Sequence, residues 1–181
     1  TNLRLWHTQI SDVSPLGELT QLTELSLWDN KVSDVSALKG LKRLTNLELV
    51  RIKISDLSAI INVLKGHREL KTLSLSDNQI KDVSSLKELK QLKVLQLSNN
   101  QISDADPLKE LKELTYLHLA DNKIIDVSAL KELKQLTWLN LNDNQISDLS
   151  PLKELKELTY LRLWHNQVSD LSPLKELKQL T

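Results

Sequence analysis

The stretch LTYLRLWHNQVSDLSPLKELKQ, from Leu158 to Gln179, is one complete unit of a pattern that fills the chain. A near twin of its first half, LTELSLWDNKVSD, runs from Leu22 to Asp34. The leucines, the Asn and the Ser-Asp pair coincide in the two stretches, whereas Glu24, Ser26, Asp29 and Lys31 are replaced by Tyr160, Arg162, His165 and Gln167. The constant columns therefore build the fold, and the variable columns are free to serve another purpose.

The pattern LxxLxLxxNxIxDxSxLxxLxx recurs along the whole chain, usually every 22 residues. With a partial copy that enters at Thr1 there are eight units and no break in composition between them, so we expect a single domain over residues 1–181. Because the sequence begins and ends in mid-pattern, we also expect it to be a piece of a longer protein. The first Leu of the complete copies falls at Leu22, Leu44, Leu70, Leu92, Leu114, Leu136 and Leu158.

The alternation Leu-x-Leu predicts a short β-strand in every copy. In such a strand Leu161 and Leu163 point to one side, and Tyr160 and Arg162 point to the other. Neighbouring copies should pair as parallel strands, with the leucines stacked into one interior ladder.

Two polar columns follow each strand, and both predict turn chemistry. An Asn suits a side chain that hydrogen-bonds backbone groups where the chain turns inward, and an Asp stabilises turns in a similar way. The Asn column comprises Asn30, Asn78, Asn100, Asn122, Asn144 and Asn166. The Asp column comprises Asp12, Asp34, Asp56, Asp82, Asp104, Asp126, Asp148 and Asp170.

The segment after each turn predicts a short helix on the outer side. Leucines three apart, such as Leu152 and Leu155, are typical of an α- or 3₁₀-turn laid against a core. A Ser or Asp directly before Pro reads as an N-cap followed by Pro at the first helical position. The N-caps predicted in this way are Ser14, Asp106, Ser150 and Ser172.

The third copy is irregular. Ile52 stands where the Asn is expected, and Leu44 and Leu70 are 26 residues apart, with a longer helix predicted to end at Gly66. The extra residues either bulge outward to contact a partner or form a larger buried helix, and we favour the buried helix.

Repeats such as LTWLNLNDNQISDLSPLKELKE (residues 136–157) resemble the 22-residue leucine-rich repeats of bacterial internalins. They are equally similar to the repeat regions of Roco-type GTPases and of cyanobacterial signalling proteins. The resemblance covers the whole chain. It implies an α/β fold: a right-handed leucine-rich-repeat solenoid with a concave parallel sheet and short α- or 3₁₀-turns on the convex side. Internalins are surface adhesins whose concave sheets grip host receptors, so the resemblance also implies a role in protein binding.

Composition and motifs argue against several other functions. Lys plus Arg equals Asp plus Glu at 24 each, so no net charge attracts nucleic acid or an anionic membrane. No apolar run approaches the roughly 20 residues of a membrane span. His118 and His165 should lie about 10 Å apart, two strands away from one another, which is too far to share a metal. We therefore expect no enzyme activity, no cofactor, no nucleic-acid partner and no membrane insertion.

The aromatic residues occupy only two columns of the repeat, both on the predicted concave face. Counting the first Leu as position 1, Tyr116, Trp138 and Tyr160 stand at position 3, and Trp6, Trp28 and Trp164 at position 7. Such residues are enriched at binding hot spots because they offer large rigid surfaces. Together with His118, Arg162 and His165 they are our predicted partner-binding residues.

These residues predict two binding patches, one at each end, separated by coils that present mostly small polar groups. The predicted partner is another protein or a flanking domain of the parent chain. Alternatively the rings stack on one another, and the array is a structural spacer or dimerisation stalk. The clean SPLKELK units also suit an engineered array, although the irregular third copy argues against a pure consensus design. The predicted spacer residues are Ser74, Ser76, Asp77, Gln96, Ser98 and Asn99.

Overall fold

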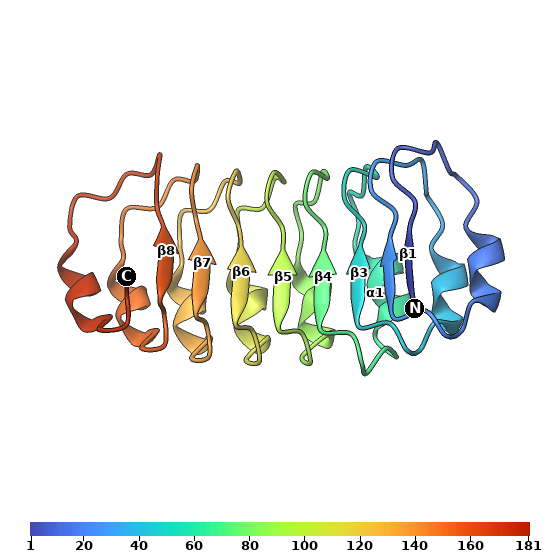
Figure 1. Cartoon of the computed structure of the whole chain (residues 1–181). Helices are drawn as coiled ribbons and strands as arrows, with labels where there is room; N and C mark the ends of the chain where they lie inside the picture. Colours follow the sequence, from blue (N-terminus) through green and yellow to red (C-terminus); the bar gives the residue numbers. More distant parts are fainter.

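The structure, a computed structural model, describes all residues from 1 to 181. Each of its eight coils contributes one short strand to a single parallel sheet with the order β1 to β8 (Figure 1). The pairing keeps every column in register, so that Leu117 lies between Leu95 and Leu139. The strands are β1 (Asn2–Arg4), β2 (Glu24–Ser26), β3 (Asn46–Glu48), β4 (Thr72–Ser74), β5 (Val94–Gln96), β6 (Tyr116–His118), β7 (Trp138–Asn140) and β8 (Tyr160–Arg162).

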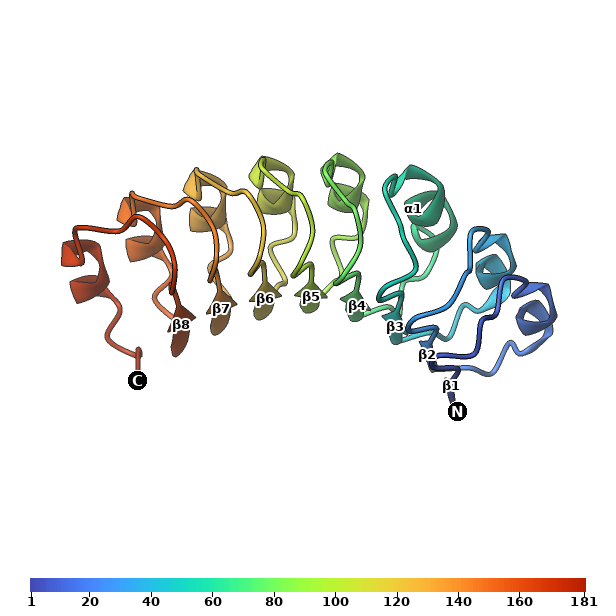
Figure 2. The same ribbon diagram turned by 90° about the horizontal axis from the view of Figure 1, so that it is seen from above.

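Short helices cover the other side of the array. Figure 2 shows the strands along the inner side of an arc and the helices along its outer side. This arrangement confirms the predicted leucine-rich-repeat solenoid, and none of the helices is both long and apolar enough to cross a membrane. The helices are η1 (Ser14–Glu18), η2 (Ser36–Gly40), α1 (Ser58–Leu64), η3 (Ser84–Glu88), η4 (Asp106–Glu110), η5 (Ser128–Glu132), η6 (Ser150–Glu154) and η7 (Ser172–Glu176), where η denotes a 3₁₀-helix.

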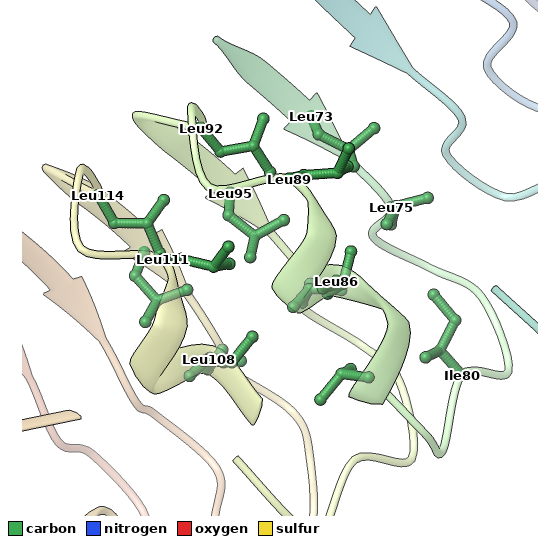
Figure 3. Packing of buried hydrophobic residues seen from close by; sticks show 14 of the residues in the cluster. Leu73, Leu75, Ile80, Leu86, Leu89, Leu92, Leu95, Leu108, Leu111 and Leu114 are labelled. Carbon is green, nitrogen blue, oxygen red and sulfur yellow. The ribbon is translucent and has the colours of Figure 1, made fainter. Parts of the chain in front are cut away.

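The core is a stack of aliphatic side chains between the sheet and the helices. In Figure 3 Leu73 and Leu95 from the strands face Leu86 and Leu89 from the helix side, and all four are fully buried. The buried apolar residues form one cluster that runs through the coils. The predicted inward orientation of the leucines is confirmed.

The Asn column hydrogen-bonds the backbone between and within coils. Asn122 Nδ2 donates to the carbonyl oxygens of Leu97 and Leu119 at 3.0 and 3.1 Å, and its Oδ1 accepts from the N–H of Ile102 at 3.0 Å. The same bonds recur at Asn144. The side chain thus satisfies backbone groups that the turn leaves without partners.

The Asp column also confirms the predicted turn chemistry, but the predicted N-caps are wrong. Asp12 Oδ1 accepts the N–H of Ser14 at 2.8 Å, and an equivalent bond reaches the residue two positions after each Asp of the column. The four predicted caps are instead the first residues of their 3₁₀-helices. The apolar residue before each of them is the N-cap, and its side chain makes no hydrogen bond. The four residues are Ser14, Asp106, Ser150 and Ser172. The Asp instead satisfies the N–H of the first helical residue, one of the donors that the start of a helix leaves free.

The third coil carries α1, the one α-helix of the chain. Ile60, Ile61 and Leu64 on this helix are buried, in agreement with the buried-helix interpretation. The helix ends at Leu64, two residues before Gly66, and the next turn buries His67 completely.

Candidate functional site on the concave sheet

Position 3 of three successive coils builds an aromatic ladder of Tyr116, Trp138 and Tyr160 on β6, β7 and β8. The Tyr116 and Trp138 rings are stacked with centroids 4.0 Å apart, and the Trp138 and Tyr160 rings with centroids 5.2 Å apart. Both pairs are within a few degrees of parallel. Parallel strands space equivalent side chains by about 4.8 Å, so the register itself enforces the stacking.

Arg162 extends the ladder toward Trp164. Its guanidinium carbon lies 5.2 Å from the centre of the Tyr160 ring and 5.9 Å from that of Trp164, and its Nε donates to the Tyr160 hydroxyl. Trp164 itself is 69% exposed, the most open aromatic side chain among the exposed large hydrophobic residues. We call Tyr116, His118, Trp138, Tyr160, Arg162, Trp164 and His165 the C-terminal patch.

His118 is held in its neutral form beside the ladder. Its Nε2 accepts from the Asn140 amide at 3.0 Å, and its ring meets the Trp138 ring edge-on, with centroids 5.6 Å apart. Burial lowers the pKa of His118. The negative charge of Asp121 opposes this effect, and the positive charge of Arg162 reinforces it to a lesser extent than Asp121 opposes it. Asn140, from the next strand, is thus the side-chain hydrogen-bond partner of His118.

Position 8 has a backbone task that the sequence reasoning missed. His165 Nδ1 lies 2.6 Å from Asp143 Oδ1 of the preceding coil, and the two residues have φ values of 52° and 53°. Among non-glycine residues, Asn, Asp and His are several-fold enriched at positive φ. The recurrence of these residue types at position 8 could have predicted the positive φ from the sequence. Arg51 is the one residue of the column that is not Asn, Asp or His. The residues concerned are His7, Asp29, Arg51, Asp77, Asn99, Asp121, Asp143 and His165.

A second group, which we call the N-terminal patch, comprises Arg4, Trp6, His7, Trp28 and Asp29. Trp6 and Trp28 meet edge to face at 5.7 Å, and Arg4 lies 5.6 Å from the centre of the Trp6 ring. His7 Nδ1 pairs with Asp29 at 2.6 Å. Figure 1 shows that β1 and β2 lie at the opposite end of the sheet from β6 to β8, so the two patches do not meet.

The middle coils present polar side chains that bond to one another. The Ser98 hydroxyl donates to Ser76 Oγ at 2.9 Å, and Asn99 Nδ2 donates to Asp77 Oδ1 at 2.6 Å. These bonds connect neighbouring coils through the variable positions, so the predicted spacer residues also stabilise the sheet. Across the whole chain, no three His, Asp or Glu side chains are placed to hold one metal ion.

Comparison with known proteins identifies the family. The family model described as "Leucine Rich repeats (2 copies)" matches residues 1–40, 20–62, 68–110, 90–132, 112–154 and 134–176. None of the curated proteins matches the sequence significantly.

Solved structures give a narrower grouping. Internalin C2 of Listeria monocytogenes is 38% identical over 99% of this chain and 77% of its own, with a TM-score of 0.92. Internalin F of the same organism is 35% identical over 96% of this chain and 63% of its own, with a TM-score of 0.65. The leucine-rich-repeat protein LIC12759 of Leptospira interrogans is 28% identical, with a TM-score of 0.77, over 100% of this chain and 53% of its own. The chain thus spans less than two thirds of these last two proteins.

The repeat columns, the strand register and these matches agree, and the chain belongs to the leucine-rich repeat family, as a bacterial protein of the internalin-like class.

Proposed function

We propose that this chain is a protein-recognition module that binds a partner protein on its concave face, chiefly through the C-terminal patch. Leucine-rich-repeat proteins, the internalin-like ones included, are in general non-enzymatic scaffolds for protein–protein interaction. The proposal goes further by choosing the face and the residues.

The observation that carries the proposal is the rigid aromatic ladder with the exposed Trp164 next to it. Tyr116, Trp138 and Tyr160 are fixed by their stacking, so little side-chain entropy remains to be lost on binding. Trp164 is exposed at the end of this ladder, beside Arg162. Tyr, Trp and Arg are the residue types that dominate binding hot spots.

The experiment uses peptides selected from a random phage-displayed library on the immobilised chain. Their affinities are then measured by fluorescence polarisation for the wild type and for the triple variant Trp138→Ala, Tyr160→Ala, Trp164→Ala. We expect the variant to lose binding by at least roughly 100-fold, because each hot-spot residue is worth about 2 kcal/mol or more.

The matched control is Lys112→Ala, Glu113→Ala, Glu157→Ala, three exposed side chains outside the strands. This variant should bind as the wild type does, and far-UV circular dichroism should show the same fold for all three proteins. Selected peptides that bind the aromatic variant as tightly as the wild type would contradict the proposal.

The stacking also favours a second candidate function, a structural spacer or dimerisation stalk. Rings that stack on one another stabilise the sheet without any ligand. In that case the number of coils would matter and the patch would not. With one fluorophore at each end of the chain, deleting one coil would then change the energy transfer between the two fluorophores. The triple aromatic variant would leave this energy transfer unchanged.

A further inference from the structure

The joint between the second coil (residues 22–43) and the third coil (residues 44–69) lacks two hydrogen bonds that every other joint has. At the six other joints the position-11 N–H donates to an Asn Oδ1 of the next coil, as Ile80 does to Asn100 at 3.0 Å. At the same six joints a backbone N–H of the next coil donates to the position-11 carbonyl, as Gln101 does to Ile80 at 2.8 Å. Val32 makes neither bond.

The cause is the missing Asn at position 9. Ile52 offers no acceptor to the Val32 N–H, and the following Lys53 has a φ of 63°. Gln9, which follows Thr8 in the other coil without the Asn, likewise has a positive φ of 61°. The reversed φ turns the Lys53 N–H away from the Val32 carbonyl, so one substitution removes both bonds.

A groove opens at the same joint. Its volume is about 610 Å³, and it is lined from both coils by Val32, Val35, Ile52, Ile54 and, on α1, Ile60 and Val63. On the concave side the joint is intact, since Leu27 N–H donates to Glu48 and Asp29 N–H donates to Val50, both at 2.9 Å. The two coils are thus joined along the sheet and separated along part of their outer side.

One buried side chain bridges the outer side. His67 Nε2 lies 2.9 Å from the Leu38 carbonyl oxygen of η2, so the ring donates this hydrogen bond as the Nε2–H tautomer. His67 is fully buried, and its Nδ1 has no partner. A proton on Nδ1 would create a fully buried cation, which costs free energy that opening the joint to water would recover.

The surroundings of His67 offer no compensating negative charge. Lys42, from the turn after η2, is the charged group that acts on the ring, and its charge is positive. The flanking Lys65, Arg68 and Glu69 are exposed. From the turn after η3 the neutral Gln91 amide donates to the His67 backbone carbonyl at 3.0 Å.

We propose that the joint between the second and third coils is a hinge that mild acid opens: protonation of His67 splays the coils apart on their outer side, with the intact β2–β3 pairing as the axis. The opening increases the curvature of the arc seen in Figure 2 and moves the N-terminal patch toward the C-terminal patch. This inference rests on the proposed function where both patches bind one partner: acid then shortens the distance between the two patches that the partner has to bridge.

The direction of the pH effect follows from linkage. Burial holds the pKa of His67 below its ordinary value of 6.5. The hydrogen bond to the Leu38 backbone opposes this effect, Lys42 adds to it, and the backbone of Leu64 and Val63 opposes it more weakly. The closed joint therefore binds fewer protons than the open one, and its stability falls as the pH drops below about 6.5 toward the lowered value. At this joint the N–H groups of Ser36 and Ser58 lower the pKa of Asp34 and Asp56 below 3.8, so these two carboxylates do not contribute in this window.

Spin labels across the groove test the hinge directly, because the chain has no native cysteine. The labels are placed with Ser33→Cys and Ser55→Cys, at equivalent positions of the second and third coils. The matched control pair is Ser147→Cys and Ser169→Cys, at the same positions of the seventh and eighth coils. Pulsed dipolar spectroscopy at about pH 7.5 and about pH 5 should show the first distance lengthening and the second unchanged.

Two variants decide whether His67 and the missing Asn are responsible. In His67→Gln the side-chain amide can still donate to Leu38 but cannot titrate, so the acid response should disappear. Ile52→Asn restores the acceptor for Val32, and should slow hydrogen exchange in residues 31–36 on the order of tenfold at neutral pH. An unchanged groove distance at about pH 5, or the same lengthening in His67→Gln, would overturn the proposal.

Discussion

At the scale of single residues, the fold depends on side chains that bond the backbone. Asn122, like its counterparts, satisfies groups of two coils at once, and this role was predictable because the column recurs with the period of the turn. The residue that occupies the cap site was not predictable. The Ser-Pro pairs suggested that Ser caps the helix, but the Asp two positions earlier bonds the N–H of that Ser instead, as Asp148 does for Ser150 at 2.8 Å.

Replacing Asn122 with Ala should be costly. The change leaves the buried Ile102 N–H without its acceptor and removes one of the two hydrogen bonds that each of three backbone carbonyls accepts, and we expect a loss of about 3 kcal/mol in the free energy of unfolding. Urea denaturation measures this loss. Gln135→Ala, an exposed amide without a hydrogen bond, is the control and should change stability by less than about 0.5 kcal/mol. Equal effects of the two changes would show that the Asn bonds contribute nothing.

At the scale of elements, each 3₁₀-helix begins at an N–H held by an Asp. The Ser36 N–H, and to a lesser extent its side chain, lowers the pKa of Asp34 below its ordinary value of 3.8. The folded state therefore binds fewer protons than the unfolded one. The resulting stability is present above that ordinary value and is lost as the pH falls through the lowered one.

Asp34→Ala should consequently lower the thermal midpoint at about pH 7, and by less at about pH 2.5, where a larger fraction of the wild-type carboxylate is protonated than at pH 7. Thermal unfolding followed by circular dichroism at both pH values checks this expectation. Ser33→Ala, an exposed neighbour, serves as the control and should leave the midpoint unchanged at either pH. A difference between wild type and Asp34→Ala that is the same at both pH values would rule out the carboxylate as the cause.

The aromatic ladder connects three strands, so its members should differ in their effect on stability. Trp138 stacks on a ring on each side, and Trp138→Ala should cost about 2 kcal/mol. Trp164→Ala removes a side chain that is 69% exposed and should cost less than about 0.5 kcal/mol. Urea titrations of both variants make the comparison. Similar losses would mean that stacking does not stabilise the sheet.

At the scale of the whole molecule, the array is a line of coils that each contact only their neighbours, so stability depends on position along it. The same column of leucines is fully buried at Leu117 and only partly buried at Leu161 in the last coil. The hinge proposed between the second and third coils has the same origin, since one weak joint is enough to divide a linear array.

Leu117→Ala should therefore destabilise the chain by about 3 kcal/mol, and Leu161→Ala by less than about 2 kcal/mol. Both changes remove the same atoms from position 4, so each is the other's control. Chemical denaturation followed by tryptophan fluorescence and by circular dichroism measures the two losses. Equal losses would show that the end coil is as well packed as the centre.

The sequence by itself determined the period, the strand in each coil, the inward leucines, and the tasks of the Asn and Asp columns. These features are local, and they repeat often enough to be read from one chain. Only the tertiary structure decided how the rings of Tyr116, Trp138 and Tyr160 stack, which partner His118 takes, and why position 8 prefers Asp, Asn and His. It also revealed that Ile52 and His67 act at the same joint. Each of these depends on contacts between coils, where residues more than 20 positions apart are brought within hydrogen-bonding distance by register alone.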